Sequence, residues 1–210
     1  MCIFLLCCSF HFQQIDVVIH PLNITNYPPS LSIPSLSKLG EDDFVFEAYS
    51  AVKQRVSNFA SGIVDMGVKS GQQTYVGLYS INRPEWVICE QAINSMSMIL
   101  VPLYDTLGPD AVKFIVNQAQ ISLVVADASK IVVLLKNVAA MPSVKIIVKM
   151  GFVTEEEQAL AQANNVQVVA FSEVEKRGRS FHHAPVPPTP QDVATVCYTS
   201  GIASLCNSFS

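Results

Sequence analysis

The chain has 210 residues, of which 50% are hydrophobic and only 14% are charged, against about 25% charged in a typical globular protein. Its net charge of −4 and its lack of long lysine or arginine runs disfavour a nucleic-acid partner. Although the mean hydropathy is +0.36, no stretch reaches the roughly 18 consecutive apolar residues of a membrane-spanning helix. We therefore predict no transmembrane span, and peripheral membrane association stays open.

Charged residues are scarce mainly at the two ends of the chain. Residues 1–40 carry two charged side chains and residues 182–210 carry one, and eight of the twelve prolines lie in these flanks. We expect residues 1–40 to be a disordered or non-native extension and residues 41–201 to be globular. The six cysteines show no CxxC pair and no Cys/His spacing suited to zinc, which predicts reduced thiols in an intracellular compartment and no metal site.

The globular part begins with an amphipathic helix over 46–68 that ends at Gly67, followed by a β-prone run at 74–80. A second helix starts near Asn82, with a proline in its first turn, and continues to about Met96. Further strands are expected at 98–103, 122–126, 144–149 and 166–170, with a helix after each. Two of these helices begin at expected capping boxes, at 154–157 and 172–175.

Strands and helices alternate along the whole segment, and this rhythm requires crossover connections between parallel strands. The sequence therefore predicts an α/β fold with a mainly parallel sheet and helices on both of its faces. A proline-rich connector at 185–190 then leads to one more buried strand at 193–199. Because ligands of such sheets bind at the carboxyl ends of strands, the turn after this strand is the predicted site.

Thr199, Ser200 and Gly201 are the residues expected at that turn. Two hydroxyl groups and a glycine can offer donors to phosphate oxygens, since the missing glycine side chain lets an anion approach the backbone. The three residues alone are also typical of a plain turn. The chain contains neither G-x-x-x-x-G-K-[ST] nor G-x-G-x-x-G, so the common phosphate-loop and dinucleotide patterns are absent.

Three stretches carry a family resemblance: residues 76–86 (VGLYSINRPEW), 101–114 (VPLYDTLGPDAVKF) and 192–201 (DVATVCYTSG). Together they resemble the AMP-forming acyl-adenylate synthetases, in particular the long-chain fatty acyl-CoA synthetases of the plant peroxisomal type. The resemblance covers residues 44–201 and implies that 41–201 is part of the large N-terminal adenylation (AMP-binding) domain. Thr199, Ser200 and Gly201 would then bind the phosphates of ATP.

The resemblance also implies a reaction: a fatty carboxylate attacks the α-phosphate of ATP, and CoA then displaces AMP from the acyl-adenylate. The implied cofactor and substrates are ATP, Mg²⁺, CoA and a long-chain fatty acid, in the peroxisome or alternatively the endoplasmic reticulum. After Gly201, however, the family pattern Thr-Thr-Gly-x-Pro-Lys-Gly is replaced by the divergent tail 202–210. The loop lysine and the later catalytic groups of the family have no counterpart, so we expect a fragment that is inactive as this chain.

Three alternatives stay open at this point. The natural transcript could continue past Gly201 with the family loop, which would make the protein an active enzyme. The chain could instead be a non-catalytic binding or interaction domain, a pseudoenzyme. An unrelated doubly wound module would explain the βα rhythm but would leave the match at 101–114 to coincidence.

The other conspicuous side chains have simpler interpretations. Trp86 is expected to pack against a helix, Cys197 to be an inert buried thiol, and His182 and His183 to be a solvated pair. The remaining polar groups are interpreted as helix-end, turn or surface residues: Arg83, Glu85, Asp105, Thr106, Glu155, Glu156, Glu157, Lys176, Arg177 and Arg179.

Overall fold

A computed structural model describes residues 5–6, 32–35, 45–104 and 110–198. Its centre is a five-stranded sheet with the strand order β5-β4-β6-β7-β8, and every neighbouring pair is parallel. The strands are β4 (Tyr75–Tyr79), β5 (Ile99–Pro102), β6 (Leu123–Asp127), β7 (Ile146–Met150) and β8 (Gln167–Ala170). This confirms the predicted parallel sheet.

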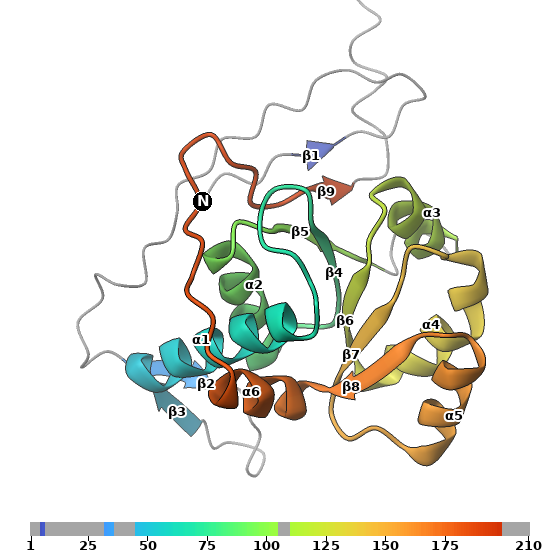
Figure 1. The fold of residues 1–210 in the computed structure, drawn as a ribbon, viewed down its shortest axis with the longest axis horizontal. Helices are drawn as coiled ribbons and strands as arrows, with labels where there is room; N and C mark the ends of the chain where they lie inside the picture. The colour runs from blue at the N-terminus through green and yellow to red at the C-terminus, as the bar shows by residue number, and fades with distance from the viewer. Residues whose placement is uncertain (1–4, 7–31, 36–44, 105–109, 199–210) are drawn as a thin grey trace, which may run out of the picture.

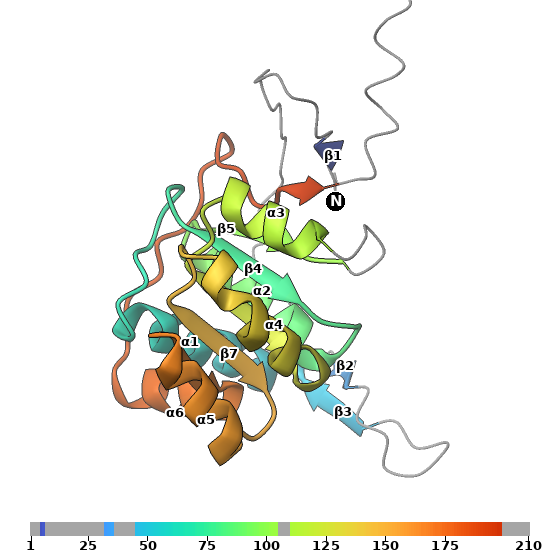
Figure 2. The same cartoon turned by 90° about the vertical axis from the view of Figure 1, so that its right-hand side faces the viewer.

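Helices cover both faces of this sheet (Figures 1 and 2). One layer contains α1 (Tyr49–Asp65), α2 (Pro84–Ser95) and α6 (Phe171–Ser180). The opposite layer contains α3 (Ala111–Gln118), α4 (Ile131–Asn137) and α5 (Glu155–Ala163). The short 3₁₀ turns η3 (Ala128–Lys130) and η4 (Val138–Ala140) flank α4. No helix of the described part is both long and apolar enough to cross a membrane.

Alternation along the strands divides the core into two clusters. On β5, Leu100 packs with the α1 layer, while its neighbour Val101 packs with the α3 layer. Leu123 and Val124 on β6 divide in the same way. All four side chains are fully buried, as expected for strands covered on both faces, whose sequences read as continuous apolar runs.

Helices α1 and α6 approach each other closely, because two glycines lie at their contact. A Cβ atom at Gly178 would collide with the carbonyl oxygen of Asn58, and one at Gly62 would collide with that of Val174. Beside this contact the rings of Phe59 and Phe171 stack at 4.1 Å between centroids. The two glycines therefore allow the short distance between α1 and α6. Both lie within helices and neither is needed for a turn.

Helix α1 starts later than predicted, because residues before it form a strand. Strand β3 (Val45–Ala48) pairs antiparallel with β2 (Ser32–Ser35). The helix then ends as expected, with Gly67 at φ +93°. Within the predicted extension 1–40 the structure describes only β1 (Leu5–Leu6) and β2. The domain boundaries proposed from the sequence stay predictions.

The two predicted capping boxes have opposite outcomes. At α5 the Thr154 hydroxyl accepts from Glu157 N at 3.2 Å, and the Glu157 carboxylate accepts from Thr154 N at 2.9 Å. The box predicted at Ser172 is wrong, since α6 already begins at Phe171 and its N-cap Ala170 makes no side-chain cap bond. The apolar Phe171 is drawn into the core, which moves the start of the helix one residue before the serine. Likewise α2 is preceded by Arg83 rather than by Asn82 as its N-cap residue.

Candidate functional site at the carboxyl edge of the sheet

The predicted site residues Thr199, Ser200 and Gly201 lie outside the described residues, as does the tail 202–210, whereas the segment that leads to them is described. Leu100 N donates to the carbonyl oxygen of Ala194 at 2.8 Å, and Val196 N donates to that of Leu100 at 2.9 Å. Residues 194–196 therefore run parallel to β5, with Thr195 opposite Leu100. This extends the parallel arrangement by one more segment, although the regular strand there is shorter than predicted.

That regular strand is β9 (Cys197–Tyr198), which pairs with β1. Figure 1 shows the connector after α6 passing alongside α1 and α2 before it reaches β9 near β5. Val196 and Tyr198 are buried in the core on the α3 side. Since β5 runs toward the same edge, the chain leaves the sheet at its carboxyl end directly before Thr199.

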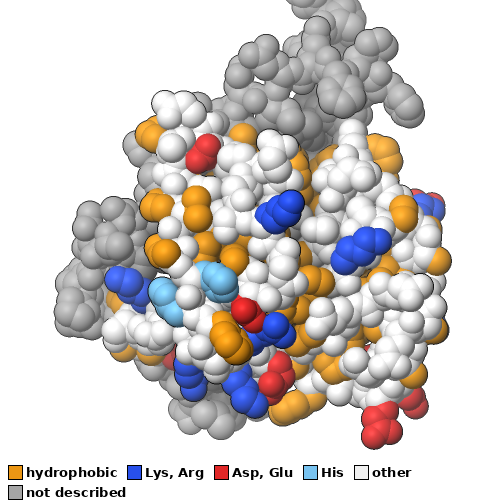
Figure 3. All heavy atoms as spheres, in the orientation of Figure 1, with side chains coloured by type: hydrophobic (Ala, Val, Ile, Leu, Met, Phe, Trp, Pro, Cys, Tyr) orange, Lys and Arg blue, Asp and Glu red, His pale blue; other side chains and the backbone are white. Residues whose placement is uncertain are grey.

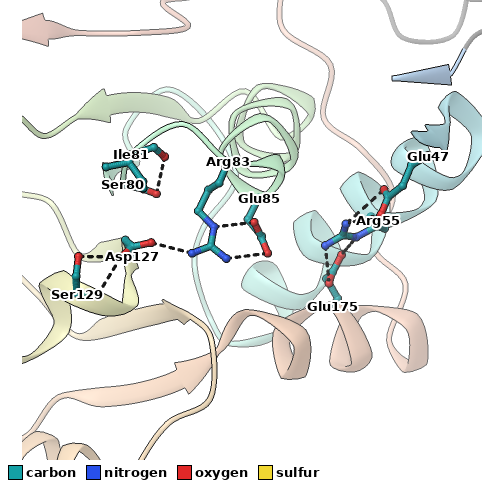
Figure 4. Close-up of polar contacts among 9 residues, drawn as sticks. All are labelled: Glu47, Arg55, Ser80, Ile81, Arg83, Glu85, Asp127, Ser129 and Glu175. Carbon is teal, nitrogen blue, oxygen red and sulfur yellow. Dashed lines mark hydrogen bonds and ion pairs between the residues drawn. The ribbon is translucent and has the colours of Figure 1, made fainter. Parts of the chain in front are cut away.

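The order of the sheet also places a switch point between β4 and β6. The helix after β4 is α2, on one face, whereas the helix after β6 is α4, on the other face. Connections that diverge in this way open a crevice at the carboxyl ends of the two strands, where ligands of α/β proteins bind. Among the described residues, Arg83 and Asp127 face each other across this place (Figure 4).

Arg83 is held by two carboxylates. Its Nη1 lies 2.7 Å from Asp127 Oδ2, and its Nε lies 2.8 Å from Glu85 Oε2. The hydrogen bond to Glu85 raises the pKa of Arg83 against the opposing effect of burial. Burial opposes ionisation of Asp127, but hydrogen bonds from Ser129 and Arg83 bring the pKa of that carboxyl below its ordinary value. The sequence predicted local partners for Arg83 and Glu85, and it missed the bridge to Asp127.

A second ion pair, which was also not predicted from the sequence, lies at the carboxyl end of β7. Lys149 Nζ lies 2.7 Å and 2.8 Å from the two carboxylate oxygens of Glu157, and both side chains are at least nine-tenths buried. Burial opposes the charge of Glu157, yet the bonds from Lys149 and Thr154 N lower the pKa of its carboxyl. Glu157 thus caps α5, as predicted for the 155–157 run, and also neutralises a buried lysine.

The remaining conspicuous residues show no catalytic arrangement within the described part of the chain. Trp86 is partly buried against the α1-layer cluster, as predicted. The imidazole of His183 lies 3.8 Å from Asp65, and Figure 3 shows the two described histidines together beside acidic and basic side chains. No group of three or more His, Cys, Asp or Glu side chains in the described residues could hold a metal ion.

The two described cysteines differ in their surroundings. Cys89 is fully buried on α2, and its burial raises the pKa of the thiol. Cys197 is half-buried, and burial again raises the pKa of its thiol. Neither lies in a setting that favours a reactive thiolate, but the expectation that Cys197 is buried is wrong, because its short strand leaves that side chain partly exposed. Asp105 and Thr106 lie outside the described residues.

Comparison with known proteins gives the family. Residues 42–203 match the AMP-binding enzyme family. This chain belongs to that family. It is 43% identical over 159 residues to long chain acyl-CoA synthetase 6, peroxisomal, of Arabidopsis thaliana, covering 76% of this chain and 22% of that protein. It is 40% identical over 157 residues to human long-chain-fatty-acid–CoA ligase 6, covering 73% of this chain and 22% of the relative.

Solved structures share the fold. A long-chain-fatty-acid-CoA ligase from Archaeoglobus fulgidus superposes with a TM-score of 0.60 at 20% identity, covering 80% of this chain and 30% of that structure. The adenylation domain of a carboxylic acid reductase from Segniliparus rugosus, solved with AMP, gives 0.58 at 20% identity and covers 70% and 25%. The chain therefore spans less than a third of the length of these relatives.

Proposed function

We propose that this chain contributes the first part of the adenylation domain of a long-chain fatty acid–CoA ligase. The observation that carries the proposal is the 43% identity over 159 residues to a plant long chain acyl-CoA synthetase. The described fold supports it, because residues 194–198 run parallel to β5 and reach the carboxyl edge directly before Thr199. Ligands of parallel sheets bind at that edge.

In this proposal, backbone N–H groups and hydroxyls at Thr199, Ser200 and Gly201 hold phosphate oxygens of ATP. Fixed donors of this kind stabilise the charge that develops during phosphoryl and adenylyl transfer. Magnesium would supply further positive charge to those oxygens. We assign it no residue, because the described part of the chain offers no group of three carboxylate, histidine or cysteine ligands.

We further propose that the 210-residue chain does not make acyl-CoA by itself. Its sequence contains no lysine or arginine after Arg179, so the segment that follows Gly201 supplies no cation for phosphate oxygens. A long-chain fatty acid, ATP and CoA remain the proposed substrates, and the peroxisome is the proposed compartment because the plant relatives carry that designation in their names.

A hybrid enzyme tests the assignment to the ligases. Residues 42–198 of this chain would replace the matching segment of the Arabidopsis peroxisomal synthetase, which keeps its own loop after that point. We expect AMP formation that depends on a long-chain fatty acid such as oleate. A hybrid that folds and binds ATP but forms no AMP would favour the non-catalytic alternative.

The full chain tests the second proposal. We expect it to show no oleate-dependent exchange between ATP and pyrophosphate above a protein-free blank, with the intact Arabidopsis enzyme as the positive control. Exchange by the purified 210-residue chain would overturn the proposed inactivity and leave the ligase assignment in place.

A further inference from the structure

The side chain of Gln72 makes the two backbone hydrogen bonds with Val193 that a neighbouring strand would otherwise make. Its Nε2 donates to the carbonyl oxygen of Val193 at 3.1 Å, and its Oε1 accepts from Val193 N at 2.7 Å. The same Nε2 donates to the carbonyl oxygen of Ser97 at 2.8 Å. One primary amide therefore satisfies both backbone groups of Val193 and ties them to the turn before β5.

The turn at Ser97 holds the connector at a second point. Ser97 Oγ donates to the carbonyl oxygen of Val186 at 2.9 Å, and Val186 N donates to that of Ser95 at 3.0 Å. This turn is itself fixed to the turn of Gln72, since Gly71 N donates to the carbonyl oxygen of Met96 at 2.9 Å. Two adjoining turns thus hold the connector at Val186 and again at Val193.

The loop between these two points has little freedom of its own. It contains three prolines, which restrict the backbone, at positions 187, 188 and 190. A turn closes its end, because Thr189 N donates to Asp192 Oδ2 at 2.7 Å and Asp192 N donates to the carbonyl oxygen of Thr189 at 3.1 Å. Val193 therefore enters its pairing with β5 from a fixed starting point.

The position of Val193 relative to β5 decides where the chain leaves the sheet. Residues 193–198 run from the turns at the amino ends of β4 and β5 toward the carboxyl edge, with Thr195 opposite Leu100. A slip by one residue would move the exit by about 3.3 Å and reverse the face of every side chain. After Val193, two backbone hydrogen bonds with Leu100 and the burial of Val196 and Tyr198 on the α3 side oppose such a slip, and the contacts of Gln72 fix the residue from which this pairing starts.

We propose that Gln72 is a positioning residue, which fixes the register of residues 193–198 against β5 and so the place where the chain reaches the carboxyl edge. Any effect of Gln72 on phosphate binding at Thr199, Ser200 and Gly201 rests on the proposed function. The register itself rests on the contacts of Gln72, Ser97 and Val193. Gln72 would act through these contacts and would not touch the substrates.

Alkylation of Cys197 tests the proposal in the full chain. Gln72→Met keeps the length of the side chain and removes its three hydrogen bonds, and Gln73→Met is the matched control, because Gln73 is the exposed neighbour. With iodoacetamide at fixed pH, we expect Gln72→Met to raise the rate at Cys197 by about tenfold, as a locally freed segment would. Cys89, buried on α2, should stay within about twofold in both variants.

Two results would overturn the proposal. One is an unchanged rate at Cys197 in Gln72→Met. The other is an equal rise at Cys89, which a general loss of stability would produce. If Gln72→Met does not fold, Gln72→Glu keeps the acceptor for Val193 N and loses both donations; a rate at Cys197 equal to that of the unaltered chain would then refute the role. No step in this assay needs ATP, so failure of the ligase assignment leaves its outcome unaffected.

Discussion

The two helical layers of this protein are held in different ways. In the α1 layer, contacts join residues far apart in sequence: Arg55 on α1 binds Glu175 on α6 at 2.8 Å, 120 positions away (Figure 4). In the α3 layer, a buried ion pair joins Lys149 to Glu157, eight positions away. The α1 layer thus depends on contacts between distant parts of the chain, whereas parts of the α3 layer are stabilised by contacts between near neighbours in sequence.

The connector that leads to the proposed phosphate site lies on the α1 side. The hydroxyl of Ser61 on α1 accepts from His183 N at 3.1 Å. Arg177 near the end of α6 pairs with Asp65 at the end of α1. The α1 layer, which is held by contacts between distant residues, therefore also holds the segment on which the proposed function depends. Variants in the two layers should differ in how far along the chain their effects on stability extend.

The largest effect is expected in the α3 layer, at Lys149→Met. Removing one member of a buried ion pair leaves the Glu157 charge without its partner, which typically costs about 3–5 kcal/mol of unfolding free energy. Urea denaturation measures the loss. Lys145→Met, on the exposed start of the same segment, should change stability by no more than about 0.5 kcal/mol. Equal losses in both variants would contradict a special role for the pair.

The next effect is expected in the α1 layer, at Gly178→Ala. The added methyl group would collide with backbone atoms of α1, and overpacking of this kind costs about 3 kcal/mol, the upper end of its usual range. In amide exchange we expect faster rates in both α1 and α6, since each helix must move. Ser172→Ala, exposed on α6, is the control and should leave both helices unchanged.

Acidification should weaken the Lys149–Glu157 contact. The pKa of Glu157 is lowered in the folded chain, so its contribution is fully present above the ordinary carboxyl value of 4.5 and is lost as pH falls through the lower folded value. The difference in unfolding free energy between the unaltered chain and Glu157→Gln should therefore shrink below about pH 4. A difference that stays constant from pH 7 to pH 3 would exclude this source of stability.

The smallest effect is expected at Thr154→Ala. This variant removes the hydroxyl that accepts from Glu157 N, and loss of an N-cap side chain costs about 1 kcal/mol. Amide exchange should increase in the first turn of α5 and remain unchanged in α1 and α6. An increase that spread to α1 would remove the contrast between a locally held layer and a long-range one.

The same contrast explains what the sequence could predict. The strand–helix rhythm, the parallel sheet and the capping box at Thr154 follow from periodicity and neighbouring residue types, and the structure confirms them. Contacts such as Arg55–Glu175 and Gln72–Val193 leave no local pattern, because their partners are brought together only by the fold. The failed capping box at Ser172 has a similar cause, since tertiary burial of Phe171 overrides the local signal.

The candidate site was predicted less completely than the fold. The place of Thr199, Ser200 and Gly201 after an apolar strand predicts a turn there, and both the turn and its phosphate-binding role stay predictions because these residues lie outside the described part of the chain. Lys149 gave no signal, because a lysine within an apolar strand resembles an edge or surface position until its partner is known. Glu157 both caps α5 and neutralises Lys149, and the second of these roles could be seen only in the folded structure.

The pairing of Leu100 with Thr195 has a consequence for synthesis on the ribosome. Strand β5 has β4 on one side, and its other side receives residues 194–196, which are made almost a hundred residues later. At about 5–20 residues per second, that side stays unpaired for roughly 5–20 s after β5 has been made. An open strand edge is a template for pairing with other chains. Early recognition of β5 by a chaperone would protect the nascent chain during that interval.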